Sequence, residues 1–231
     1  MMDRPREPQQ GADEYSPAKY AAPVDAIVLA GTHNNPDRLV RGRNKAFLDI
    51  EGRALVRHVV DALTAAQTIG RVFVVGPKQE LEAVLADCPD TFCVQQQGKL
   101  VRNGWAAVHA MEAEGPHLSK ERLLERPVLV ISCDLPLISR GAVDDFIGRC
   151  AAIDEASPDN HAMLCGIAEK TGLEPFYGTA DRPGVVRPLV QMNEGLVRLS
   201  NIYVFRPYKL THAEFLQTSF TLRKAKDWHN V

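Results

Sequence analysis

Short apolar runs alternate along the chain with segments whose apolar residues recur every three or four positions. The apolar runs lie at residues 26–29, 71–76, 92–94 and 127–132. Such runs are too short for isolated helices, and the first ends at Ala30 and Gly31, so we expect buried β-strands. Helical spacing follows Gly52 and recurs at residues 79–86 and 100–112. The repeated order of strand, helix and strand predicts a mostly parallel sheet that is covered by helices on both faces.

The second half of the chain continues this pattern and adds an antiparallel hairpin. We expect a helix at residues 141–153 and a strand at 162–168. Residues 185–192 and 196–205 predict an antiparallel pair, in which Pro188 marks an edge strand or a bulge. The predicted fold class is therefore α/β, a three-layer α/β/α sandwich with a Rossmann-like, mostly parallel sheet and one antiparallel hairpin.

The composition favours one globular domain without a global charge bias. The chain has 231 residues, which suffice for one substantial core. Its 27 Lys and Arg residues nearly balance 29 Asp and Glu residues, so the net charge indicates neither a nucleic acid nor an anionic membrane as a partner. We expect a disordered leader at residues 1–22, a domain at 23–210, and a basic C-terminal helix or tail at 211–231.

The cysteines and the hydropathy predict where the protein works. Five cysteines, an odd number without a C-x-x-C pair, favour free thiols and hence the cytoplasm. We find no signal-peptide pattern and no apolar run of about 18 residues, so neither export nor a membrane span is expected.

A cationic loop follows the first predicted strand. It contains the glycines Gly31 and Gly42 and four cationic side chains, namely Arg38, Arg41, Arg43 and Lys45. This composition predicts a loop that closes over a polyanion. The alternative is a solvated connection whose cations face water.

Asp134 lies at the end of the fourth predicted strand, within Cys133-Asp134-Leu135-Pro136. Because the carboxyl ends of parallel strands share one edge of a sheet, we expect Asp134 on the same rim as the cationic loop. A carboxylate beside cations suits a polyphosphate that carries Mg²⁺, with the ion held between Asp134 and the phosphates. The alternative is an aspartate that forms a turn or caps a helix next to Pro136.

Three segments resemble one family of enzymes. They are Leu29-Ala30-Gly31, residues 44–55 with the sequence NKAFLDIEGRAL, and residues 133–136 with the sequence CDLP. They are similar to nucleotidyltransferases of the glycosyltransferase-A-type fold, in particular to the molybdenum cofactor guanylyl- and cytidylyltransferase-like group, the MobA-like NTP transferases. The resemblance implies a fold of the nucleotide-diphospho-sugar transferase type with the hairpin in the acceptor half. It also implies the Mg²⁺-dependent transfer of a nucleoside monophosphate from an NTP to a small, phosphorylated acceptor, with release of pyrophosphate.

The resemblance also implies roles for individual residues. Lys45, Asp134 and Arg38 take the catalytic positions, with Asp134 as the Mg²⁺ ligand. The positions implied to contact the nucleotide are Leu29, Ala30, Gly31, Arg41, Arg43, Gly98 and Asn103.

The acceptor half and the tail supply further candidates. The resemblance places Asn201 against the acceptor, and Lys170 and Arg187 are candidates to hold an anionic acceptor group. Alternatively, Asn201 satisfies the backbone of a bulge, and the two cations are solvated strand ends. The cations of the tail, Lys224 and Lys226, lie on a solvated helix or, as an alternative, on a lid or a homodimer contact near the phosphates.

The first loop departs from the family pattern. The usual sequence is L-A-G-G-x-G-x-R, whereas residues 29–38 read LAGTHNNPDR and lack the second and third glycines. Glycine lets backbone amides approach a phosphate closely, and Pro36 has no amide hydrogen to offer. Arg41 or Arg43 is therefore an alternative to Arg38. Two other functions stay open: a glycosyltransferase that uses a nucleotide-sugar, which would usually need a D-x-D pair, and a non-catalytic nucleotide-binding regulatory module.

Overall fold

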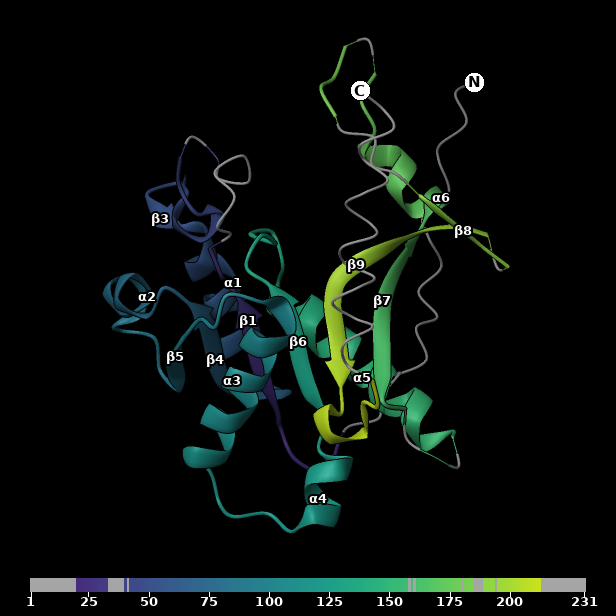
Figure 1. The fold of residues 1–231 in the computed structure, drawn as a ribbon. Coiled ribbons are helices and arrows are strands. Elements are labelled where there is room, and N and C mark those ends of the chain that lie inside the picture. The colour runs from purple at the N-terminus through teal and green to yellow at the C-terminus, as the bar shows by residue number, and fades with distance from the viewer. Residues whose placement is uncertain are drawn as a thin grey trace.

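The computed structural model describes residues 20–32, 40, 42–157, 159, 161–179, 181–184, 189–193 and 195–212. These residues contain a seven-stranded sheet with the order β5-β4-β1-β6-β9-β7, and β8 pairs with β9 (Figure 1). Four strands are parallel to one another: β1 (Val24–Leu29), β4 (Ile69–Gly76), β5 (Thr91–Gln95) and β6 (Val128–Ser132). The antiparallel part consists of β7 (Met163–Glu169), β8 (Val190–Met192) and β9 (Gly195–Phe205).

Helices cover the two faces of this sheet. The larger core cluster joins the sheet to α1 (Leu55–Thr64), α2 (Lys78–Leu85) and α5 (Arg140–Glu155). The smaller cluster lies on the other face, under α3 (Leu100–Ala113). Short elements complete the described chain: α4 (Lys120–Glu125), α6 (Lys170–Leu173), the 3-10 turns η2 (Lys45–Phe47), η3 (Glu174–Phe176) and η4 (Pro207–Lys209), and a ribbon of β2 (Asp49–Ile50) and β3 (Arg53–Ala54). The three-layer α/β/α prediction is confirmed.

The apolar runs form strands because both of their faces are buried. In β1, Ala26, Ile27 and Val28 are at most 1% exposed. Ile27 packs under α3, while Ala26 and Val28 belong to the cluster on the opposite face. Burying one such Val or Ile side chain contributes about 1.5–3 kcal/mol, so the apolar run at residues 26–29 strongly favours a central strand.

A buried ion pair joins the end of β9 to α5. Arg206 is 2% exposed, and its Nη2 donates to Asp154 Oδ2 at 2.8 Å while its Nη1 donates to the carbonyl of His161 at 2.7 Å. The hydroxyl of Tyr20 donates to the same carboxylate at 2.6 Å. Burial alone would raise the pKa of Asp154, but the hydrogen bonds from Arg206, Tyr20 and His161 lower this pKa to about 2. The cluster therefore joins the end of β9 to α5 through an ion pair that stays charged at neutral pH.

Several expectations about the fold differ from the structure or lie outside its described part. No sequence pattern indicated α4 or the β2–β3 ribbon, and none predicted that β9 lies between β6 and β7. Tyr20, which the prediction counted in the leader, contacts Asp154. Residues 185–188, the first 19 residues and the tail from 213 lie outside the described residues. No helix in the described ranges combines the length and the apolarity that a membrane crossing requires.

Candidate functional site

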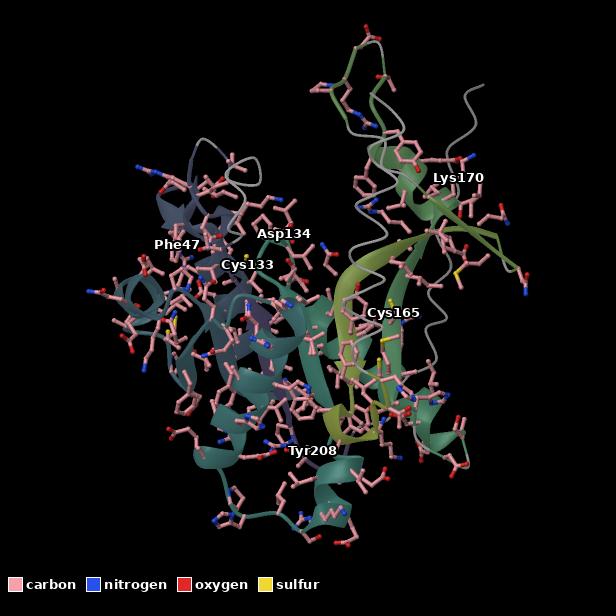
Figure 2. The ribbon with its side chains drawn as sticks, in the orientation of Figure 1. Phe47, Cys133, Asp134, Cys165, Lys170 and Tyr208 are labelled. Carbon is pink, nitrogen blue, oxygen red and sulfur yellow. The ribbon has the colours of Figure 1, made fainter. Side chains whose placement is uncertain are left out.

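The carboxyl ends of β1, β4, β5 and β6 form one rim of the sheet. The amide of Ala30 donates to Val75 O at 2.8 Å, and the amide of Cys133 donates to Leu29 O at 3.2 Å, so the end of β1 is held between its two neighbours. Gly76 allows this approach, because a Cβ there would lie 2.8 Å from Ala30 O. Figure 2 shows Asp134 at this end of the sheet and Tyr208 at the opposite end.

Asp134 is held by three side chains at the rim. Oδ1 accepts from Ser132 Oγ at 2.6 Å and lies 3.4 Å from Asn201 Nδ2. Oδ2 lies 4.0 Å from Lys45 Nζ, and the two side chains are 33% and 52% exposed. This carboxylate does not cap the next helix, because the N-cap of α5 is Ser139. Asp134 is thus oriented, open to a ligand, and opposite a cation.

Lys45 begins the 3-10 turn η2, directly after Asn44. The Asn44 side chain caps this turn by accepting from Ala46 N at 3.0 Å. Its Nδ2 donates to Ala30 O at 2.9 Å and lies 3.0 Å from Thr32 Oγ1. Asn44 therefore connects the base of the lysine to the end of β1.

Two side-chain amides lie against Gly31, one from Gln96, which follows β5, and one from Asn103 on α3. Gln96 Oε1 accepts from Thr32 N at 2.7 Å, and Asn103 Oδ1 accepts from Gln97 N at 2.6 Å. A Cβ on Gly31 would lie 3.0 Å from Asn103 Nδ2 and 3.3 Å from Gln96 Oε1, so any larger residue at this position would push these two amides aside. Gly98 has a φ of +81°, a conformation that other residues rarely adopt.

The structure brings together seven of the predicted site residues and leaves Lys170 apart. The residues at the rim are Leu29, Ala30, Gly31, Lys45, Asn103, Asp134 and Asn201. Gly98 lies in the loop that leads from the same edge into α3, and Arg43 is an exposed residue that bridges to Val40. Lys170 begins α6, pairs with Glu174 at 3.4 Å, and lies well away from Asp134 (Figure 2). Arg38, Arg41 and Arg187, like the tail lysines, are outside the described residues.

Sequence reasoning missed three polar residues at this rim. Ser132, Asn44 and Gln96 carry no charge and resemble ordinary turn or cap residues. Two signals could have identified them: Ser132 lies two positions before Asp134 at a strand end, and Asn44 is a favourable N-cap residue directly before Lys45.

The donor set fits a magnesium ion that arrives with phosphates. Among the described residues there is no group of three or more His, Cys, Asp or Glu side chains that could hold a metal ion. Mg²⁺ is commonly bound through one or two carboxylates, with phosphates and water as the other ligands, so the single oriented carboxylate of Asp134 suits it. The neighbouring Cys133 does not act as a thiolate here, because burial raises its pKa to about 12.

Comparisons with known proteins bear on the family and the fold of the chain. The family model of the MobA-like NTP transferase domain matches residues 26–194. A hypothetical transferase from Thermus thermophilus is 24% identical with a TM-score of 0.54, over 80% of this chain and 66% of that one, so this chain spans less than two thirds of its length. No curated protein matches the sequence.

Two further structures are more distant in sequence. A 4-diphosphocytidyl-2C-methyl-D-erythritol synthase from Anaerococcus prevotii is 10% identical, with a TM-score of 0.51 over 80% of this chain and 70% of that one. A CMP:2-keto-3-deoxy-manno-octonic acid synthetase in complex with CTP is 15% identical, with a TM-score of 0.52 over 90% and 86%. At these identities the likeness shows the fold, which is the predicted nucleotide-diphospho-sugar transferase type.

Proposed function

The chain belongs to the MobA-like NTP transferase family, and on this premise we propose that it is a nucleotidyltransferase. The proposed reaction moves a nucleoside monophosphate from an NTP to a small, phosphorylated acceptor and releases pyrophosphate. The observation that carries the proposal is the pairing of Lys45 Nζ with Asp134 Oδ2 at 4.0 Å across the rim.

The chemistry follows from the charges on either side of this pair. An acceptor phosphate oxygen attacks the α-phosphorus, the bond from the α-phosphorus to the bridging oxygen breaks, and pyrophosphate leaves with the electron pair. No general base is required, because a phosphate oxygen is already an anion. Lys45, together with Arg38, Arg41 or Arg43, neutralises the charge that builds on the leaving group.

Asp134 is the residue proposed to hold Mg²⁺, with Asn201 beside it. Asp134 would hold the ion, whose chemistry there would be to neutralise charge and to orient the phosphate oxygens. Ser132 keeps one carboxylate oxygen engaged by its 2.6 Å hydrogen bond, which leaves Oδ2 directed toward Lys45 and the ligand.

The acceptor is proposed to enter from the antiparallel half of the sheet. Asn201 lies on β9 and contacts Asp134, so an acceptor that reaches Asn201 also lies beside the attacked phosphorus. Lys170 and Arg187 remain the candidates for the distal anionic group. Because Lys170 lies away from Asp134, it would contact a part of the acceptor that is remote from the reacting phosphate.

One observation favours a second candidate, the non-catalytic nucleotide-binding module. Thr32 stands where the family pattern has a glycine, and its amide hydrogen is already engaged by Gln96 Oε1 at 2.7 Å. A backbone amide of this kind is the donor that a phosphate would use.

The test combines binding with turnover. The thermal stability of the protein is measured with each of the four NTPs, with and without Mg²⁺, and pyrophosphate release is measured across a panel of sugar phosphates and pterin-type acceptors. A ligand at 100 times its dissociation constant stabilises a protein by about 2.7 kcal/mol, which is readily seen as a shift in Tm. A Mg²⁺-dependent shift with pyrophosphate release supports the proposal, and a shift without turnover supports the binding module. Release of a nucleoside diphosphate from a nucleotide-sugar would instead identify a glycosyltransferase.

A further inference from the structure

The carboxamide of Asn44 uses its donors and its acceptor to join three parts of the site. Nδ2 lies 2.9 Å from Ala30 O and 3.0 Å from Thr32 Oγ1, and Oδ1 accepts from Ala46 N at 3.0 Å. The carbonyl of Ala30 can only accept, so the amide nitrogen has to face it. One side chain thus fixes the end of β1, Thr32 and the first turn of η2 relative to one another.

This arrangement sets the position from which Lys45 reaches Asp134. Lys45 is the next residue after Asn44, and its ammonium group lies on a flexible stem that is 52% exposed. A lysine of this kind loses much side-chain entropy when it is held in one place, so the starting point of its stem has to be fixed. The two hydrogen bonds of Asn44 Nδ2 fix that starting point against β1, whose neighbour β6 leads into Asp134.

Thr32 and Asn44 together give a use to one departure of the first loop from the family pattern, the missing second glycine. Where that pattern has a second glycine, this chain has a hydroxyl that accepts from Asn44 at 3.0 Å. The side chain that replaces the glycine is therefore used to hold the lysine-bearing turn.

We propose that Asn44 is a positioning residue, whose carboxamide holds Lys45 opposite Asp134 and which acts on the bound nucleotide only through Lys45. This inference rests on the proposed function. It assigns two separable tasks to Asn44. Oδ1 caps η2, which is a structural role, and Nδ2 connects η2 to β1 by a hydrogen bond and so positions Lys45.

The variants Asn44→Ser and Asn44→Asp separate these tasks. Serine and aspartate both accept a hydrogen bond at an N-cap, so each keeps the cap, whereas neither has an amide to donate to Ala30 O and Thr32 Oγ1. A misplacement of about 1 Å in a catalytic group can cost about 10²-fold in rate, so we expect kcat to fall by about 10- to 100-fold. The matched control is Asn193→Ser, in the exposed turn between β8 and β9, for which we expect an unchanged rate.

A double-mutant cycle with Lys45→Ala tests whether Asn44 acts through the lysine. If it does, Asn44→Ser lowers kcat in the wild-type background and has no further effect when Lys45 is already alanine. An indirect effect on folding would instead lower the rate in both backgrounds and would lower Tm. The proposal is overturned if the two losses multiply, or if Asn44→Ser retains the wild-type kcat.

The same cycle can be read in nucleotide binding, which separates a failure of this inference from a failure of the proposed reaction. If the wild type is stabilised by Mg²⁺ and an NTP but releases no pyrophosphate, the proposed reaction fails. The inference then still predicts that each single variant weakens the stabilisation and that the double variant weakens it no more than Lys45→Ala does. If no NTP stabilises the wild type, the proposed function and this inference both fail.

Discussion

Replacing Asp134 should separate the stability of the protein from its activity. In the variant Asp134→Asn the side chain keeps its shape and one oxygen that can accept from Ser132 Oγ, but it loses the charge that faces Lys45. The variant Asp134→Ala removes the oxygens as well. We expect both variants to fold and both to lose nucleotidyl transfer.

The structure sets the size of each effect. At 4.0 Å, with side chains 33% and 52% exposed, the ion pair between Asp134 and Lys45 is close to a surface pair. Such pairs contribute about 0–1 kcal/mol to the free energy of unfolding, so Asp134→Asn should change it by less than about 1 kcal/mol. The loss of one charge contact in the transition state costs about 2.7–4 kcal/mol, which is a fall of about 10² to 10³ in kcat.

The assay is urea denaturation in parallel with pyrophosphate release at saturating NTP and Mg²⁺. The matched control is Asp145→Asn, on the exposed face of α5, where the carboxylate pairs with Arg149 at 2.8 Å and is 54% exposed. This control should leave both the stability and the rate nearly unchanged. An Asp134→Asn enzyme that turns over at the wild-type rate would refute the metal-binding role, and one that loses several kcal/mol of stability would refute the description of Asp134 as an open rim residue.

Four further predictions concern single residues. Gly31→Ala places a Cβ 3.0 Å from Asn103 Nδ2, so we expect the NTP-dependent rise in Tm to be lost while the variant still folds. Folding lowers the pKa of Asp154 from 3.8 to about 2, which contributes about 2 kcal/mol to the free energy of unfolding above pH 4. This contribution is lost as the pH falls toward 2. Urea denaturation across this pH range measures the loss, and Asp154→Asn should remove the pH dependence. The variant Arg206→Ala, which leaves that buried carboxylate without its cation, should lose about 3–5 kcal/mol at neutral pH. Lys170→Ala should raise the KM for the acceptor by about tenfold, the loss of one charge-assisted hydrogen bond, and leave the KM for the NTP unchanged, whereas an unchanged acceptor KM would remove Lys170 from the acceptor site.

The parallel half of the fold could be predicted because its strands are buried on both faces. Residues 26–29 of β1 are apolar without alternation, and the apolar positions of α1 form a single stripe, namely Leu55, Val56, Val59, Val60 and Leu63. The spacing of apolar residues along the chain indicates which side chains are buried, but it does not indicate which strands are neighbours in the sheet. The place of β9 between β6 and β7 depends on pairing across the whole chain, and a six-residue helix such as α4 buries no residue that would mark it.

The charged half of the site could be predicted for a geometric reason. Lys45 and Asp134 follow different strands of one parallel sheet, and such strands end at the same edge. The uncharged residues of the site, Asn44, Gln96 and Ser132, could not be predicted. They act through hydrogen bonds whose partners are set by the tertiary fold. Asn, Gln and Ser are also common in solvated turns, so their presence in the sequence does not mark a functional rim.

The missing glycine at position 32 does not by itself exclude catalysis, and the hydrogen bonds of Thr32 explain why. Its hydroxyl is engaged by Asn44 at 3.0 Å, and its amide is engaged by Gln96 Oε1 at 2.7 Å. A phosphate oxygen that takes this amide replaces one acceptor with another, and a hydrogen bond to a charged oxygen is roughly twice as strong as one to a neutral oxygen. The displaced Gln96 amide is only part-buried, so water can reach it and the exchange leaves no fully buried polar group unpaired. Gly31 is present, and the loop therefore keeps a residue without a Cβ beside the amides of Gln96 and Asn103 at the end of β1.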